Sequence, residues 1–168
     1  MLEFRDTLLT NLKTVEDVLY ALFSTTTLDE VHGINTHTSS GWVKDRIKIK
    51  YKLPIDNVPE LLTYLIGDKY VRGKFKAERI VEADGTIFIK GVIVPKIFGS
   101  SLVRIKPSYR IIPPKQKEGN VAIEFYCKVK ATLPDGLKAR CEEFMNETVK
   151  NNFKYTGDSL RRQNMLAD

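Results

Sequence analysis

Residues Val121–Phe153 read VAIEFYCKVKATLPDGLKARCEEFMNETVKNNF, and two hydrophobic periods meet within this stretch. Up to Ala131, apolar residues alternate with polar ones, which is typical of a β-strand with one buried and one exposed face. From Leu137 onward, apolar residues recur every three or four positions, which predicts a long amphipathic helix. We interpret Asp135 as the N-cap of this helix and Gly157 as the residue at which it ends or kinks. The stretch therefore predicts a strand followed by a long closing helix.

The preceding part of the chain supplies further strand-like segments. Thr86–Val94 is apolar at both parities, so we expect it to lie centrally in a sheet or to be covered on both faces. Asp84-Gly85 provides the tight turn before it. The segments that we interpret as strands are Glu3–Thr10, Trp42–Leu53, Tyr70–Ile80, Thr86–Val94, Leu102–Ile112 and Val121–Ala131.

Short helices are predicted between the first strands. The pattern Thr14-Val15-Glu16-Asp17 is typical of a helix start, and an apolar stripe follows it as far as Phe23. A second short helix is predicted at Leu28–Ile34, and a third at Val58–Gly67, with Gly67 as a C-terminal stop. Helices of two or three turns are marginal alone, so we expect them to pack on the sheet.

This order of elements predicts an α+β fold. A sheet with one apolar face cannot leave that face in water, and the long C-terminal helix is the element available to cover it. We therefore expect a curved antiparallel sheet wrapped around the long C-terminal helix, the helix-grip arrangement, with two short helices after the first strand. Residues 1–168 are expected to form one domain, with 161–168 as a frayed tail.

Composition excludes several classes of protein. The 168 residues are 42% hydrophobic and 29% charged, unlike collagen-like, disordered or disulfide-scaffold chains. No apolar run approaches the length of a membrane-spanning helix, and the first residues lack the pattern of a signal peptide. We therefore expect a cytoplasmic protein. The net charge of +6 favours anionic partners weakly.

The order and some local stretches resemble the START-like superfamily, which includes lipid-transfer domains and polyketide cyclases. The resemblance rests on Leu53–Gly67 (LPIDNVPELLTYLIG), on Asp84-Gly85 and on the closing helix after Leu133-Pro134. It implies a cavity between sheet and helix that accepts a hydrophobic or amphipathic small molecule, possibly a lipid.

The side chains of inward parity are the candidate cavity wall. They could instead simply fill a core, because packed interiors are the rule. Tyr51 and Tyr109 are the informative members, since a buried phenol needs a polar partner, either internal or on a ligand. The candidate ligand-binding residues are Ile49, Tyr51, Phe75, Val103, Ile105, Tyr109, Ile123, Phe125, Cys127, Cys141, Phe144, Met145 and Val149.

The opposite parity of the strands carries many cations. Such a face is often only solvated, and lysines also protect strand edges from pairing. It could instead attract anionic lipid headgroups or phosphates. Nucleic acid is the less favoured partner because only Tyr126 interleaves with these lysines. The candidate basic surface consists of Lys44, Arg46, Lys48, Lys50, Arg104, Lys106, Lys128 and Lys130.

Residues for catalysis or metal binding are scarce. His32 and His37 have no recognised metal-ligand spacing, and neither Cys127 nor Cys141 has the context of a nucleophile, so we expect no metal, no cofactor and a reduced cysteine pair. A cyclase or dehydratase would need titratable groups that converge in the cavity, and the inward parity offers mainly phenols. The favoured interpretation is a non-enzymatic binding module for a hydrophobic small molecule. The alternative is an interaction protein with a filled core, whose basic face binds protein or nucleic acid.

Overall fold

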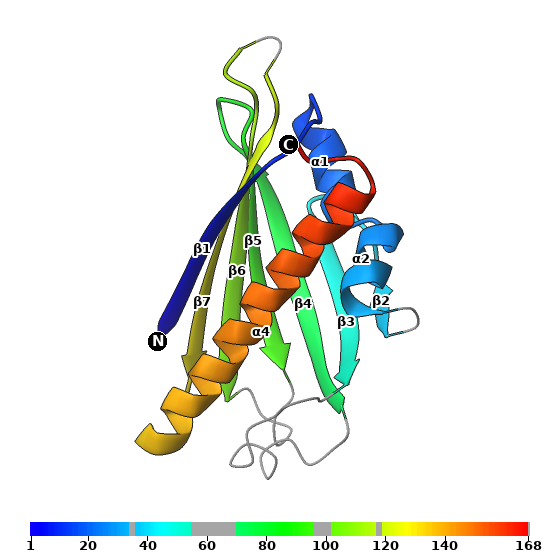
Figure 1. Cartoon of the computed structure of the whole chain (residues 1–168). Coiled ribbons are helices and arrows are strands. Elements are labelled where there is room, and N and C mark those ends of the chain that lie inside the picture. The colour runs from blue at the N-terminus through cyan, green and yellow to red at the C-terminus, as the bar shows by residue number, and fades with distance from the viewer. Residues whose placement is uncertain (34–35, 55–69, 96–101, 117–118, 168) are drawn as a thin grey trace.

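The computed structural model describes residues 1–33, 36–54, 70–95, 102–116 and 119–167 (Figure 1). The strands form one seven-stranded antiparallel sheet in the order β1-β7-β6-β5-β4-β3-β2. With the labels of Figure 1, the elements are β1 (Leu2–Leu9), α1 (Val15–Leu22), α2 (Thr25–His32), β2 (His37–Ser39), β3 (Arg46–Pro54), β4 (Tyr70–Val81), β5 (Ile87–Pro95), β6 (Val103–Ile112), β7 (Ala122–Ala131) and α4 (Asp135–Arg162).

The helices all lie on one side of the curved sheet, which we call the inner face (Figure 1). The long helix α4 crosses this face and contacts β7 and β1, and its C-terminal half lies beside α1 and α2. The opposite side is the outer face. This arrangement confirms the predicted helix-grip fold, with two short helices after the first strand.

Local capping chemistry sets the starts of the two short helices. Thr14 accepts a hydrogen bond from the Asp17 amide and begins α1, as predicted. Ser24 does the same for the Thr27 amide, so α2 begins three residues before the predicted Leu28. Gly33, at φ 97°, ends α2 because this left-handed conformation suits glycine.

The strand predictions are confirmed with one shift. β3 begins at Arg46 and not at Trp42, because Val43 and Arg46 pair in a tight turn in which Lys44 has φ 56°. Val43 is therefore 63% exposed instead of buried. β5 is central, as expected, but its outer-facing side chains are only partly covered.

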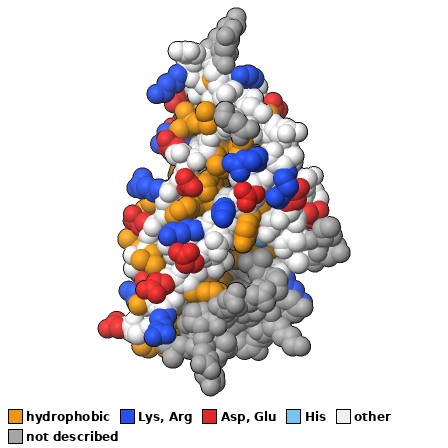
Figure 2. Space-filling model, in the orientation of Figure 1, with side chains coloured by type: hydrophobic (Ala, Val, Ile, Leu, Met, Phe, Trp, Pro, Cys, Tyr) orange, Lys and Arg blue, Asp and Glu red, His pale blue; other side chains and the backbone are white. Residues whose placement is uncertain are grey.

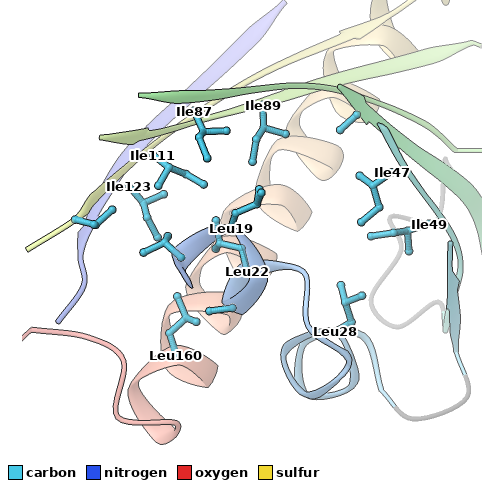
Figure 3. Packing of buried hydrophobic residues seen from close by; sticks show 14 of the residues in the cluster. Leu19, Leu22, Leu28, Ile47, Ile49, Ile87, Ile89, Ile111, Ile123 and Leu160 are labelled. Atoms are coloured by element: carbon cyan, nitrogen blue, oxygen red, sulfur yellow. The ribbon is translucent and has the colours of Figure 1, made fainter. Parts of the chain in front are cut away.

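The interior beneath α1 is a close-packed aliphatic cluster (Figure 3). Leu19 and Leu22 of α1 point toward isoleucines of the sheet, and Leu160 of α4 closes the cluster from below in this view. Leu19, Ile89 and Ile123 are fully buried. Burial of each such side chain contributes about 1.5–3 kcal/mol, so this cluster anchors the short helices.

The closing helix differs from the prediction at both ends. Its N-cap position is Pro134, and Asp135 lies in the first turn without a capping hydrogen bond from its side chain. Gly157 neither ends nor breaks the helix; it is buried where a β-carbon would meet Leu8, and α4 continues to Arg162.

The expected frayed tail at 161–168 is instead attached as far as Ala167. Leu166 is buried and pairs with Thr10, and the Ala167 amide donates to the Leu9 carbonyl at 2.9 Å. A short β-bridge next to the first strand therefore holds in place a segment that the sequence predicts to be frayed.

Two expectations fall outside the described residues. The helix at Val58–Gly67 lies there, and so does most of Leu53–Gly67, the stretch that carried much of the resemblance. Within the described part of the chain, no helix is long and apolar enough to cross a membrane.

Candidate functional site

A cavity of about 620 Å³ lies between the inner face of the sheet and the helices. This volume is in the range of small-molecule sites, and the described residues leave the space unfilled. Its wall is mainly apolar and combines α1 and α2 with strands β3 to β7 and with one side of α4. The inner face and the helices therefore leave a partly open space between them.

Nine of the thirteen candidate ligand-binding residues lie in the cavity wall. Tyr51 and Tyr109 are among them, and α4 contributes three. Their contact with a ligand remains a prediction. The nine residues are Ile49, Tyr51, Phe75, Ile105, Tyr109, Phe125, Phe144, Met145 and Val149.

The other four candidates are buried but do not line the cavity. Val103, Cys127 and Cys141 belong to one cluster in which α4 packs directly on the sheet, so no space remains between them. Ile123 belongs to the aliphatic cluster under α1 (Figure 3). Parity correctly placed these four side chains on the inner face, but the helices cover them directly.

Aromatic rings form a continuous layer across the cavity wall. Phe23 stacks on Phe75 with ring centroids 5.9 Å apart, and it meets Tyr109 edge-on at 5.7 Å. Tyr109 contacts Phe125 at 5.0 Å, and Phe125 stacks on Phe153 at 4.5 Å. Rings in these arrangements pack more favourably than their area alone implies, so this wall is rigid and apolar.

Two glycines of the sheet make room for aromatic wall residues. A β-carbon at Gly73 would collide with the Tyr51 hydroxyl and ring. A β-carbon at Gly91 would lie 2.7 Å from Cε2 of Phe75. Both glycines lie on the inner face, where a larger residue would push the aromatic ring out of position.

The hydroxyls of Tyr51 and Tyr109, two of the three tyrosines in the described wall, have no hydrogen bond with any described residue. Burial raises the pKa of Tyr51 above its ordinary value. Burial also raises the pKa of Tyr109, with a smaller effect from Cys127. Both phenols are therefore neutral and can donate and accept a hydrogen bond.

His32 is a wall residue that sequence reasoning missed. It lies at the end of α2, and its ring is nearly parallel to that of Tyr51, with centroids 6.2 Å apart. Burial, and then the neighbouring His37, lower its pKa to about 4. The spacing of Leu28, Val31 and His32 was the available signal, because these positions share one side of a helix and all line the cavity.

Behind His32, His37 is held in a fixed position. Its Nε2 atom lies 2.7 Å from Oδ1 of Asp29, and its ring centroid is 6.2 Å from that of His32. No group of His, Cys, Asp or Glu in the described ranges has the arrangement to hold a metal ion.

The two cysteines are free and buried. Burial raises the pKa of Cys127 to about 12. Burial, and then the charge of Glu142, raise the pKa of Cys141 to about 11. Both are neutral thiols at physiological pH, and they behave as small apolar side chains.

The outer face carries the predicted cations, with one exception. Lys44 lies in the turn before β3 and is not part of the face. Arg46, Lys48 and Lys50 lie on β3, Arg104 and Lys106 on β6, and Lys128 and Lys130 on β7. The face also includes three cations of β4 that sequence reasoning missed, Arg72, Lys74 and Lys76.

Like charges lie directly opposite one another on this face. This is unfavourable for the sheet, and acidic residues also lie opposite cations of the face, as at Glu3↔Lys128, Arg46↔Glu78 and Arg110↔Glu124. We call the set of cations that lie opposite other cations the cationic ladder. Its opposed pairs are Lys48↔Lys76, Lys50↔Lys74, Lys52↔Arg72, Arg104↔Lys130 and Lys106↔Lys128.

The helix side of the molecule has a different charge pattern. Figure 2 shows that basic and acidic side chains are mixed there, with hydrophobic side chains between them. Ion pairs such as Lys150–Glu147 at 3.3 Å and Arg161–Asp158 at 3.4 Å lie along α4. The segregation of cations is therefore particular to the outer face.

No protein-family model matches the sequence, and no curated protein sequence does so either. Solved structures resemble the fold. The STAR-related lipid transfer protein of Xanthomonas axonopodis has a TM-score of 0.62 at 16% identity, over 95% of this chain and 85% of that chain. A Thermus thermophilus protein has a TM-score of 0.60 at 12% identity, over 96% and 99%. The aromatase/cyclase Zhui from Streptomyces has a TM-score of 0.55 at 11% identity, over 95% and 90%. The chain thus has the helix-grip fold of START-like proteins.

Proposed function

We propose that this protein is a non-enzymatic binding module that holds a hydrophobic or amphipathic small molecule, such as a lipid, between the sheet and α4. The observation that carries this proposal is the cavity of about 620 Å³ with its layer of aromatic rings. Removal of roughly 200 Å² of ligand apolar surface from water would contribute about 5 kcal/mol, which is enough to hold a small molecule.

Catalysis of the aromatase/cyclase kind is the competing proposal, because structural neighbours include such proteins. The described cavity wall favours binding alone. Its one carboxylate, Glu147, is exposed and lies 3.3 Å from Lys150. The other titratable groups of that wall are His32 and tyrosines, so no carboxylate–histidine pair faces the cavity for general acid–base work.

Native mass spectrometry of the purified protein tests this proposal. We expect adducts of lipid-like mass that disappear after denaturation and extraction with organic solvent. Apo protein alone, both from the native host and after incubation with a total lipid extract, would contradict the proposal. Chemical conversion of an extracted ligand on prolonged incubation would instead support the enzymatic alternative.

We further propose that the cationic ladder docks this module on an anionic lipid surface. The ladder lies on the strand segments that form the cavity: Tyr51 lies between Lys50 and Lys52 on β3. Ile105 lies between Arg104 and Lys106 on β6 in the same way.

Two features favour a membrane over nucleic acid as the partner of the ladder. Val92 and Val94 of β5 are half-buried on the outer face between the two groups of cations. This combination suits a membrane, in which anionic headgroups cover an apolar interior. The aromatic residue Tyr126 is covered by Arg5, whose guanidinium lies 4.3 Å from the ring centroid, so it does not offer a free stacking face. Each cation near an anionic surface contributes about 1 kcal/mol.

Sedimentation with vesicles tests the docking proposal. Binding to phosphatidylcholine vesicles that contain phosphatidylserine should exceed binding to phosphatidylcholine alone, and Lys106→Gln/Lys128→Gln should reduce the difference. The control variant, Arg140→Gln/Lys154→Gln on α4, has the same net charge and should bind like the wild type. Equal losses in both variants, or a salt-sensitive shift of duplex DNA without vesicle binding, would contradict the proposal.

A further inference from the structure

His32 and Tyr51 form a polar end of an otherwise apolar cavity. Their rings are nearly parallel, with an interplanar angle of 16°, and both residues belong to the cavity wall. Tyr51 is held over Gly73, which leaves no room for the ring to relax toward the sheet. Helix α2 and strand β3 therefore present an imidazole and a phenol side by side.

The hydrogen-bonding capacity of this pair is unused. Nε2 of His32 and the Tyr51 hydroxyl have no hydrogen bond with a described residue, whereas Nδ1 of His32 is fully buried without a partner and does not face the cavity. Nδ1 of His37, Nε1 of Trp42 and side-chain oxygens of Thr86 and Asn146 are also buried without partners. Of these five residues, only His32 lines the cavity. A polar group that is removed from bulk water without a partner is costly, and a ligand in the cavity can supply a partner to Nε2 of His32 and to the Tyr51 hydroxyl.

The charges around this end restrict what the partner can be. No Lys or Arg is among the described residues of the cavity wall, and the one acid there, Glu147, is exposed on α4. The titratable groups in contact with His32 are Tyr51 and His37, and Asp29 faces His37. The imidazole is neutral because burial lowers its pKa to about 4. An anionic group would lose its hydration here without gaining a cation from the described residues of the wall.

We propose that His32 and Tyr51 together bind a neutral hydroxyl group of an otherwise apolar ligand, so that the cavity selects alcohols and phenols over carboxylates of similar shape. A neutral imidazole and a phenol each offer one donor and at least one acceptor, and a hydroxyl group can satisfy both. This inference rests on the proposed function, since it assigns the polar end of the same site.

Three naphthalene derivatives that share one apolar body test the assignment by isothermal titration calorimetry at pH 7. The probes are 2-naphthol, 2-methylnaphthalene and 2-naphthoate. We expect 2-naphthol to bind roughly tenfold more tightly than 2-methylnaphthalene, and 2-naphthoate to bind more weakly than either. The preference for 2-naphthol should be unchanged between pH 5.5 and pH 8, because His32 stays neutral over that range.

Substitutions then show which side chains cause the preference for 2-naphthol. His32→Leu and Tyr51→Phe should each abolish the advantage of 2-naphthol and leave the affinity for 2-methylnaphthalene within about twofold. Tyr109→Phe tests the competing position, because it removes another phenol of the same wall. Tyr20→Phe, at a residue that is 61% exposed and outside the wall, is the matched control and should keep the advantage. Retained binding of 2-methylnaphthalene shows that each variant is folded.

The outcomes separate this inference from the function on which it rests. Binding of 2-methylnaphthalene without any advantage for 2-naphthol would overturn the inference and leave the binding module intact. Loss of the advantage in Tyr109→Phe alone would also overturn it, as would tighter binding of 2-naphthoate when the pH falls to 6. No binding of any probe by the wild type would contradict the binding module itself.

Discussion

Tyr51 of β3 lies directly opposite Gly73 of β4, and its ring occupies the space that a side chain at position 73 would need. The pairing sets the position of the phenol: the absence of a side chain at Gly73 lets the ring lie across β4, where it contributes to the cavity wall. Gly73 of β4 thus determines the position of Tyr51, a candidate ligand-binding residue of the neighbouring strand β3.

Gly73→Ala should therefore destabilise the protein and displace Tyr51. We expect a loss of about 1–3 kcal/mol in the free energy of unfolding, measured with urea, since the new methyl group forces the ring to move. Gly136→Ala in the first turn of α4 is the control, because its β-carbon would meet nothing within 4 Å, and it should cause no loss. Equal stability of the two variants would show that Tyr51 is not held in this way.

Acid should weaken the fold through His32. Its pKa is about 4 in the folded protein and 6.5 in the unfolded chain, so the unfolded state binds more protons between these values. Stability from this group is complete above pH 6.5 and is lost as the pH falls toward 4, by roughly 2 kcal/mol at pH 5.

Comparison of the wild type with His32→Gln isolates this effect. The measurement is urea unfolding at pH 7.5 and at pH 5. Between pH 7.5 and pH 5, the free energy of unfolding of the variant should fall by about 2 kcal/mol less than that of the wild type, whatever its value at pH 7.5. Parallel pH dependences would mean that His32 is not a buried neutral imidazole.

Relief of repulsion in the cationic ladder should stabilise the protein while it weakens vesicle binding. Lys106 lies opposite Lys128, so Lys106→Glu replaces a like-charge pair with an opposite-charge pair. We expect a gain of about 0.2–1 kcal/mol in low salt, which shrinks in 1 M NaCl. The same variant should bind phosphatidylserine vesicles less than the wild type.

A control at Lys138 tests whether position or net charge causes these effects. Lys138→Glu on α4 changes the net charge equally but lies away from the ladder. It should not raise stability, and it should leave most vesicle binding in place. If Lys106→Glu and Lys138→Glu behave alike, the ladder has no special role.

Periodicity predicted the strands and the inner face because side-chain direction in a strand follows from parity alone. Tyr51, Phe75 and Tyr109 were found in this way. Parity could not tell cavity from packing: Cys127 and Ile123 share the inner face, but helices cover them directly. That distinction depends on where α4 and α1 sit, which no short stretch of sequence specifies.

The residues that were missed depend on contacts between elements. His32 lies in a helix that the sequence pattern predicts to begin at Leu28, whereas the Ser24 cap begins it at Thr25. Lys74 and Lys76 complete the ladder through the register of β4 against β3, and alternation within β4 is weak. Gly73 makes room for Tyr51 only because the two residues pair across the sheet. The sequence around Gly73 does not indicate this pairing.

The central claim is that one ligand binds inside the cavity, and titration with the neutral fluorescent probe N-phenyl-1-naphthylamine tests it most directly. Val149 of α4 lines the cavity, so Val149→Trp should fill part of the space and abolish binding, whereas Lys154→Gln on the exposed side of the same helix should not. We predict saturable binding of one probe per chain in the wild type and in Lys154→Gln. The absence of saturable binding in the wild type, or binding unchanged in a folded Val149→Trp variant, would contradict the account.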